Sequence, residues 1–84
     1  MFLKVTGVTY LDDYRLRLQF NDGTVREVDL QSDLYGEVFE PLLDMALFGQ
    51  ARLNPDSGTV EWPNGADLAP EYLHNIGKEV RKIA

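Results

Sequence analysis

The chain has 84 residues, 44% of them hydrophobic and 26% charged, and this composition is typical of one small globular domain over residues 1–84. Because the chain contains no cysteine, we exclude disulfides and thiolate-bound zinc. The formal net charge of -6 argues against direct binding to nucleic acid or to an anionic membrane surface, since both need a basic patch.

The first predicted strand covers residues 3–11, and the phase of its apolar side chains changes at a glycine. Leu3 and Val5 alternate in one phase before Gly7, whereas Val8 continues in the opposite phase. A shift of one residue beside a glycine is typical of a β-bulge, so we expect a bulged strand.

The next two strands form the clearest hairpin in the sequence. In the first of them, apolar and polar side chains alternate, as in a half-buried strand. A two-residue loop would place Val28 opposite Arg17, on the wrong face, whereas a three-residue loop with Gly23 in a left-handed conformation places Glu27 there. Opposite charges favour that register, and we predict the three-residue loop. The same register pairs Leu16 with Val28, Tyr14 with Leu30 and Arg15 with Asp29.

A helix and a second hairpin are predicted next. The helix begins near Pro41, because the fixed φ of proline suits a first helical turn, and it ends at Gly49. Its buried stripe has helical spacing and consists of Phe39, Leu42, Leu43, Ala46 and Leu47. The hairpin turns at residues 55–58, and its predicted pairs are Leu53 with Val60, Arg52 with Glu61 and Ala51 with Trp62.

The last predicted helix begins near Pro70. Its buried stripe consists of Tyr72, Leu73, Ile76, Val80 and Ile83, and Gly77 between them allows a close approach to the sheet. The basic residues Lys78, Arg81 and Lys82 complement the negative end of this helix, and a binding arm is the alternative. The predicted order is β-β-β-α-β-β-α. Two amphipathic helices need a sheet face to cover, so we predict an α+β fold, a two-layer sandwich in which two helices cover antiparallel hairpins.

No group of side chains in the sequence has the spacing of a catalytic or metal site. His74 is the single histidine and has no companion ligands at metal-binding spacing, so we expect a solvated helix residue. Asp12 and Asp13 are adjacent and point apart, which suits a turn better than acid–base chemistry. We predict no catalytic residue, no metal site and no cofactor, and we disfavour an enzyme.

The most unusual segment is residues 61–71, where a stiff loop follows the last predicted strand. Its structural interpretation has Trp62 in the core, a turn after it, and Asp67 as the cap of the following helix. Its functional interpretation has Asn64, Gly65 and Asp67 presented to a partner or ligand by a loop that two prolines stiffen. The structural interpretation has more weight, because each residue has a local role, and both stay open.

Three segments of the chain match a known pattern. They are LRLQFNDGTVREVDL (residues 16–30), VFEPLLD (38–44) and EWPNGADLAPEYL (61–73). Together they resemble the bacterial domain-of-unknown-function family 2442, and the Trp-Pro-Asn-Gly loop is the most specific part. The resemblance implies an α+β fold and no assigned activity. Some members of that family are encoded beside a second small protein, as in toxin–antitoxin pairs, so the resemblance makes such a neighbour a candidate partner. Other members carry an added helix-turn-helix domain, for which the residues after Tyr72 are too few.

The function that we predict is a non-catalytic protein-interaction or regulatory module, since a small acidic domain without catalytic groups has sheet edges available for strand addition. The alternative is a small-ligand-binding or enzymatic domain that uses the loop of Asn64 and Asp67. The sequence has no apolar run of the roughly 18–20 residues that span a membrane and no recognisable signal peptide, so we expect a cytoplasmic protein. The expected partner is a protein, not nucleic acid or a membrane, and a homo-oligomer is compatible with the sequence.

Overall fold

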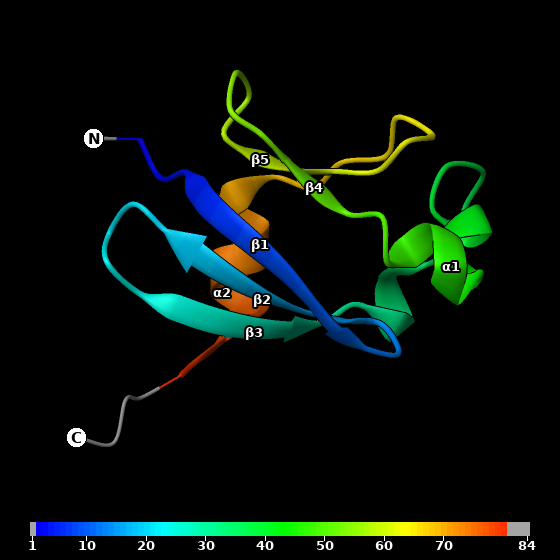
Figure 1. Cartoon of the computed structure of the whole chain (residues 1–84), viewed down its shortest axis with the longest axis horizontal. Coiled ribbons are helices and arrows are strands. Elements are labelled where there is room, and N and C mark those ends of the chain that lie inside the picture. The colour runs from blue at the N-terminus through cyan, green and yellow to red at the C-terminus, as the bar shows by residue number, and fades with distance from the viewer. Residues whose placement is uncertain (1, 81–84) are drawn as a thin grey trace.

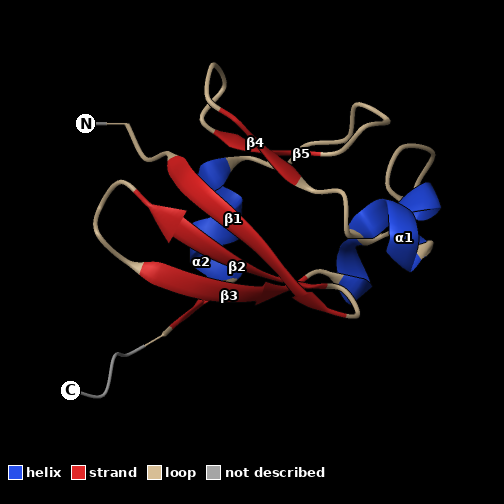
Figure 2. Cartoon of the chain, viewed as in Figure 1, coloured by secondary structure: helices blue, strands red, loops and turns tan. Residues whose placement is uncertain are grey.

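Antiparallel sheets and short helices form an α+β fold in a computed structural model, which describes residues 2–80 (Figure 1, Figure 2). The strands are β1 (Val5–Asp12), β2 (Arg15–Phe20), β3 (Val25–Asp29), β4 (Arg52–Asn54), β5 (Thr59–Glu61) and β6 (Lys78–Glu79). The α-helices are α1 (Met45–Phe48) and α2 (Pro70–Ile76), and two 3-10 helices, η1 (Gln31–Asp33) and η2 (Glu40–Leu43), precede α1. The predicted α+β class is confirmed, and the order of elements departs from the prediction at both helices.

The four-stranded sheet has the order β1-β2-β3-β6, and its first two registers follow from the sequence patterns. The register of β1 with β2 shifts between Val5 and Gly7, which confirms the predicted bulge. Between β2 and β3, Arg17 faces Glu27, and the connecting loop has three residues with Gly23 at a φ of 87°. The predicted loop length is therefore confirmed.

The two-stranded sheet is the second predicted hairpin, and it lies against β1 (Figure 1). Leu53 faces Val60 and Arg52 faces Glu61, as predicted. The side chains of the second pair also meet, with Arg52 Nε 3.2 Å from Glu61 Oε1. Alternation of apolar and charged residues thus fixes the register of both hairpins.

The core lies between the four-stranded sheet, the β4–β5 hairpin and α2. Trp62 is 1% exposed, and its indole Nε1 donates to the Phe48 carbonyl oxygen at 2.9 Å, so its predicted place in the core is confirmed. Its backbone N–H donates to Ala66 and not across to Ala51, so the third predicted pair of the hairpin does not form. The other buried apolar residues are Val5, Leu16, Leu18, Phe20, Val28, Leu30, Leu34, Leu42, Phe48, Val60, Ala66 and Leu73.

The predicted helix over residues 41–49 is divided into η2 and α1 by Asp44. This residue has an extended backbone (φ -70°, ψ 110°), and its carboxylate accepts a hydrogen bond from the Ala46 N–H at 3.0 Å. An aspartate that caps from within an apolar stripe ends one helical segment and begins the next. The prediction of one continuous helix is therefore wrong. Leu43 and Ala46 are exposed, and Phe48 supplies the buried side chain of α1.

The predicted terminal helix ends at Ile76, and the chain then runs beside β3 as β6. Gly77 is extended (φ -72°, ψ 146°), and Lys78 lies opposite Glu27 in the ladder. The ladder satisfies backbone groups at the edge of β3, which a longer helix would leave unpaired. A Cβ atom on Gly77 would lie 3.2 Å from Val28 Cγ1, so the predicted close approach to the sheet is present, although the glycine is not helical.

The basic cluster predicted at the end of the last helix begins in a strand instead. Lys78 belongs to a strand, so the prediction that it complements a helix terminus is wrong. Arg81, Lys82 and Ile83 lie outside the described residues.

Candidate functional site

The predicted loop follows β5 and is held by its own hydrogen bonds. Asn64 Oδ1 accepts from the Ala66 N–H at 3.1 Å, and Asn64 Nδ2 donates to the Val38 carbonyl oxygen at 2.8 Å. Gly65 has a φ of 89°, a left-handed value that favours glycine, and its N–H donates to the Trp62 carbonyl. Asn64 is exposed, yet both polar atoms of its side chain make hydrogen bonds within the chain, so this residue fixes the position of the segment around Val38.

Asp67 does not cap α2, contrary to the prediction. The N-cap of α2 is Ala69, which makes no side-chain hydrogen bond. The residue before a proline favours an extended conformation, and Ala69 adopts one before Pro70, so the helix begins later than the predicted cap requires. Asp67 instead forms a β-bridge with Glu61, and its side chain is exposed. The loop therefore exposes both residues, and the side chain of Asn64 is occupied by hydrogen bonds to the chain itself.

A groove of about 310 Å³ lies between η1 and α2, next to this loop. Its lining residues are Asp33, Tyr35, Phe39, Leu68 and Tyr72. Tyr35 is 75% exposed and Tyr72 is 40% exposed, so the prediction that Tyr72 belongs to a buried stripe is wrong. The backbone of Leu68 is fixed by Thr59, whose hydroxyl donates to the Leu68 carbonyl oxygen at 2.5 Å. Exposed aromatic rings around a concavity are typical of binding surfaces.

One hydrogen bond joins the two sides of this groove. The Tyr72 hydroxyl donates to Asp33 Oδ1, and this bond raises the pKa of Tyr72, as do burial and the negative charge of Asp33. Because the folded-state pKa is raised, the associated stabilisation is present below the ordinary tyrosine pKa and is lost as the pH rises above it. At neutral pH the protonated phenol therefore links η1 to α2.

The segments that form the groove carry acidic side chains and no lysine or arginine. Residues 31–50 contain Asp33, Glu37, Glu40 and Asp44, and residues 63–77 contain Asp67 and Glu71. In the first segment, these acids alternate with exposed apolar residues. A stretch of aromatic and acidic residues without a basic residue is the sequence signal that indicates this surface, and the sequence interpretation missed it.

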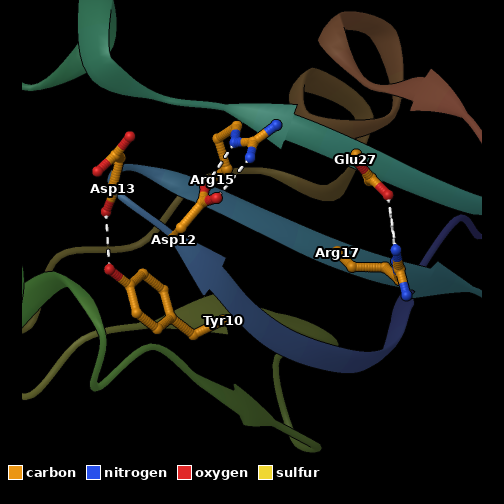
Figure 3. A network of polar contacts seen from close by, with 6 residues as sticks. All are labelled: Tyr10, Asp12, Asp13, Arg15, Arg17 and Glu27. Carbon is orange, nitrogen blue, oxygen red and sulfur yellow. Dashed lines mark hydrogen bonds and ion pairs between the residues drawn. The ribbon is translucent and has the colours of Figure 1, made fainter.

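Two arginines on the open face of the four-stranded sheet are paired with carboxylates (Figure 3). Arg15 Nε and Nη2 each lie 2.6 Å from a carboxylate oxygen of Asp12, and Arg17 Nη2 lies 2.8 Å from Glu27 Oε2. The hydrogen bonds from Arg15 lower the pKa of Asp12. Asp13 has a left-handed φ of 43°, and Asp12 and Asp13 serve the turn, as predicted.

A second groove, of about 420 Å³, runs along β3 and β6. Its lining includes Arg15, Glu27, Asp29 and Lys78, whose charges alternate in sign across the ladder. Arg15 faces Asp29 in the predicted register, yet its side chain turns to Asp12. Acidic and basic side chains are therefore interspersed along this face.

His74 is not the solvated helix residue that we predicted, because the turn between β2 and β3 partly covers it. His74 Nε2 lies 2.8 Å from Asp22 Oδ2, and its ring meets the Phe20 ring edge-on with centroids 4.9 Å apart. Asp22 also accepts hydrogen bonds from the backbone and hydroxyl of Thr24. The Thr24 bonds, followed by the His74 contact, lower the pKa of Asp22 to about 2. This pair joins α2 to the first hairpin.

Two further features concern metals and membranes. Over residues 2–80, no set of three or more histidine or acidic side chains is arranged to hold a metal ion. Within the same range, no helix has both the length and the apolar character needed to cross a bilayer.

Comparison with known proteins agrees with the resemblance seen in the sequence. A family model described as "Protein of unknown function (DUF2442)" matches residues 5–79. No curated protein and no solved structure matches the chain.

Proposed function

The chain belongs to the DUF2442 family of proteins of unknown function, and from this premise we propose that it is a non-catalytic interaction or regulatory module that binds another protein. The observation that carries the proposal is the distribution of exposed large apolar side chains. Most of them lie along residues 35–45 or on α2 across the groove: Tyr35, Val38, Leu43, Met45 and Tyr72. Aromatic and methionine side chains are enriched in protein–protein interfaces.

The loop predicted from the sequence has a supporting role in this proposal. Asn64 holds the Val38 carbonyl, and Gly65 permits the turn that places Asn64. Asp67 adds an exposed negative charge beside the groove. A segment held in place before binding loses less conformational entropy on association, so modest contacts yield useful affinity.

The expected setting follows the sequence interpretation. We propose a cytoplasmic protein whose partner is a second small protein encoded nearby, in an arrangement like that of a toxin–antitoxin pair. The net charge of -6 supports a protein partner over nucleic acid. Self-association through the same surface is compatible with the proposal.

The test is capture of the partner from the native host by the tagged chain, followed by mass spectrometry. We expect Tyr35→Ser to lose the partner, because Tyr35 is the most exposed aromatic residue of the groove. Phe2→Ser is the matched control, since Phe2 is also highly exposed and lies outside the groove. Equal capture by both variants would contradict the proposed surface, and thermal melts verify that both are folded.

A small-ligand-binding domain is the second candidate. The groove volume of about 310 Å³ is at the lower end of the range of roughly 300–1,000 Å³ that is usual for ligand pockets. Native mass spectrometry of the purified chain, together with thermal melts against a metabolite panel, distinguishes the two candidates. A bound metabolite and no captured protein would favour the ligand domain.

A further inference from the structure

We propose that the groove between η1 and α2 receives the cationic side chain of an arginine or lysine, carried by a basic segment of the protein that this chain binds. The inference rests on the proposed function and deepens it, because it states the chemistry of the partner at the same surface. Its basis is the juxtaposition of three aromatic rings with a carboxylate, inside acidic segments that contain no lysine or arginine.

The aromatic rings come from two parts of the chain. Tyr35 and Phe39 follow η1, and Tyr72 belongs to α2. The face of an aromatic ring attracts a cation, and sites walled by several rings bind ammonium and guanidinium groups. Leu68 adds an apolar wall, which suits the methylene stem of a lysine or arginine side chain.

Asp33 supplies the negative charge inside the groove. Its Oδ1 accepts the Tyr72 hydroxyl, and a carboxylate has about four lone-pair sites on two oxygens, so Oδ2 retains capacity for an N–H donor. The ion pairs of the described residues do not include Asp33. Its charge is therefore available to a ligand, whereas the carboxylates of Asp12 and Glu27 are already paired.

The segments around the groove also favour a cationic ligand. Residues 31–50 and 63–77 contain acidic residues and no lysine or arginine. Their negative electrostatic field attracts a basic segment during diffusional encounter and repels an acidic one. An uncharged apolar segment would gain the ring contacts without the electrostatic attraction, so cationic residues are preferred.

The direct test uses blocked alanine pentapeptides that differ only at the central residue, which is arginine, lysine, norleucine or glutamate. Binding to the full chain is followed by NMR through the amide and ring resonances of Tyr35 and Tyr72. We expect saturable shifts with the arginine and lysine peptides, and about fivefold or more weaker binding with norleucine. The arginine signal should decrease as salt is raised, because exposed charges are screened.

Variants separate the charge from the rings. Asp33→Asn removes the charge and keeps an acceptor for Tyr72, and we expect it to reduce arginine-peptide binding by about fivefold or more. Tyr35→Leu should weaken binding while Tyr35→Phe preserves it, because only the second keeps an aromatic face. Asp56→Asn, in the β4–β5 turn, is the control for an equal change in net charge.

The outcomes distinguish this inference from the proposed function. If a protein partner is captured but the arginine and norleucine peptides bind equally, the cationic side chain is rejected and the protein-binding function stands. Unchanged binding by Asp33→Asn, in a folded protein, also rejects it. If the arginine peptide binds as expected and no protein partner is captured, the cation site stands and the proposed function fails.

Discussion

The open face of the four-stranded sheet and the groove between η1 and α2 carry charge in opposite ways. On the sheet, Arg15 is paired with Asp12 and Arg17 with Glu27 (Figure 3). In the groove, Asp33 accepts a hydrogen bond from a neutral tyrosine, in segments without a lysine or arginine. Paired surface charges stabilise little and offer little to a partner, whereas a carboxylate among exposed rings keeps its attraction for a cation. This contrast is the basis of our proposal that the groove, and not the sheet face, binds the partner.

The largest expected effect comes from the core, which supports both regions. Trp62 is buried against Phe48, and its indole N–H donates to the Phe48 carbonyl oxygen. We expect Trp62→Ala to lower the free energy of unfolding by about 3–5 kcal/mol in urea denaturation, because a large buried side chain leaves a cavity. Trp62→Phe should cost less, since it keeps most of the packing. A loss below about 1 kcal/mol for the alanine variant would contradict the role of Trp62 in the core.

A smaller effect is expected at Asn64, and it should be confined to the groove. Asn64→Asp keeps the acceptor for Ala66 and removes the donor to the Val38 carbonyl, so we expect a loss of about 1 kcal/mol. Hydrogen exchange should increase in residues 35–39 and remain unchanged in β2. Partner affinity is then compared with wild type at matched folded fraction. Unchanged exchange and affinity would show that the loop does not hold the groove.

The contact between Asp22 and His74 gives a pH-dependent prediction on the sheet side. The pKa of Asp22 is lowered to about 2 in the folded protein, so its stabilisation is present above the unfolded pKa of about 3.9 and is lost as the pH falls through about 2. We expect wild type to be more stable than Asp22→Asn at pH 6, and the difference should shrink between about pH 4 and pH 2. Urea denaturation at several pH values measures it. Parallel stability curves for the two proteins would exclude this role for Asp22.

The smallest expected effect tests the paired charges of the sheet. Reversing Arg17 to glutamate or Glu27 to arginine places like charges opposite each other, and reversing both restores the pair. A double-mutant cycle should give a coupling of a few tenths of a kcal/mol, because the pair is largely exposed. The same reversals should leave the affinity for the arginine peptide unchanged. A change in that affinity would show that the sheet face also contributes to recognition.

The hairpins could be predicted from the sequence because their information is local. Successive side chains of β2 and β3 point to opposite faces of the sheet, and the charges of Arg17 and Glu27 select one loop length. The helices were harder to predict. The stripe from Phe39 to Leu47 has helical spacing, yet Asp44 caps a new helix inside it, and the terminal stripe does not reveal the turn at Gly77.

The groove depends on contacts between segments that are distant in the chain. Tyr35 follows η1 and Tyr72 lies on α2, so only the fold brings them together. Tyr72 has helical spacing with Leu73 and Ile76, so the sequence pattern predicted that it is buried, whereas it is exposed. In the loop, the residue types of Asn64 and Gly65 indicated a turn, but the bond from Asn64 to Val38 crosses between segments and has no local signature.

The short strand β6 has a consequence for how copies of this chain avoid one another. Unpaired strand edges are templates for aggregation, and natural sheets protect them with very short or charged strands. β6 is such a strand, since it has two residues, Lys78 and Glu79, both charged, which lie opposite Glu27 and Arg26 of β3. On the opposite side, the Val5 N–H at the start of β1 is taken by the Gly58 carbonyl of the second hairpin. Strand exchange between neighbouring molecules is thereby disfavoured at the β3 border of the sheet and at the first residue of β1.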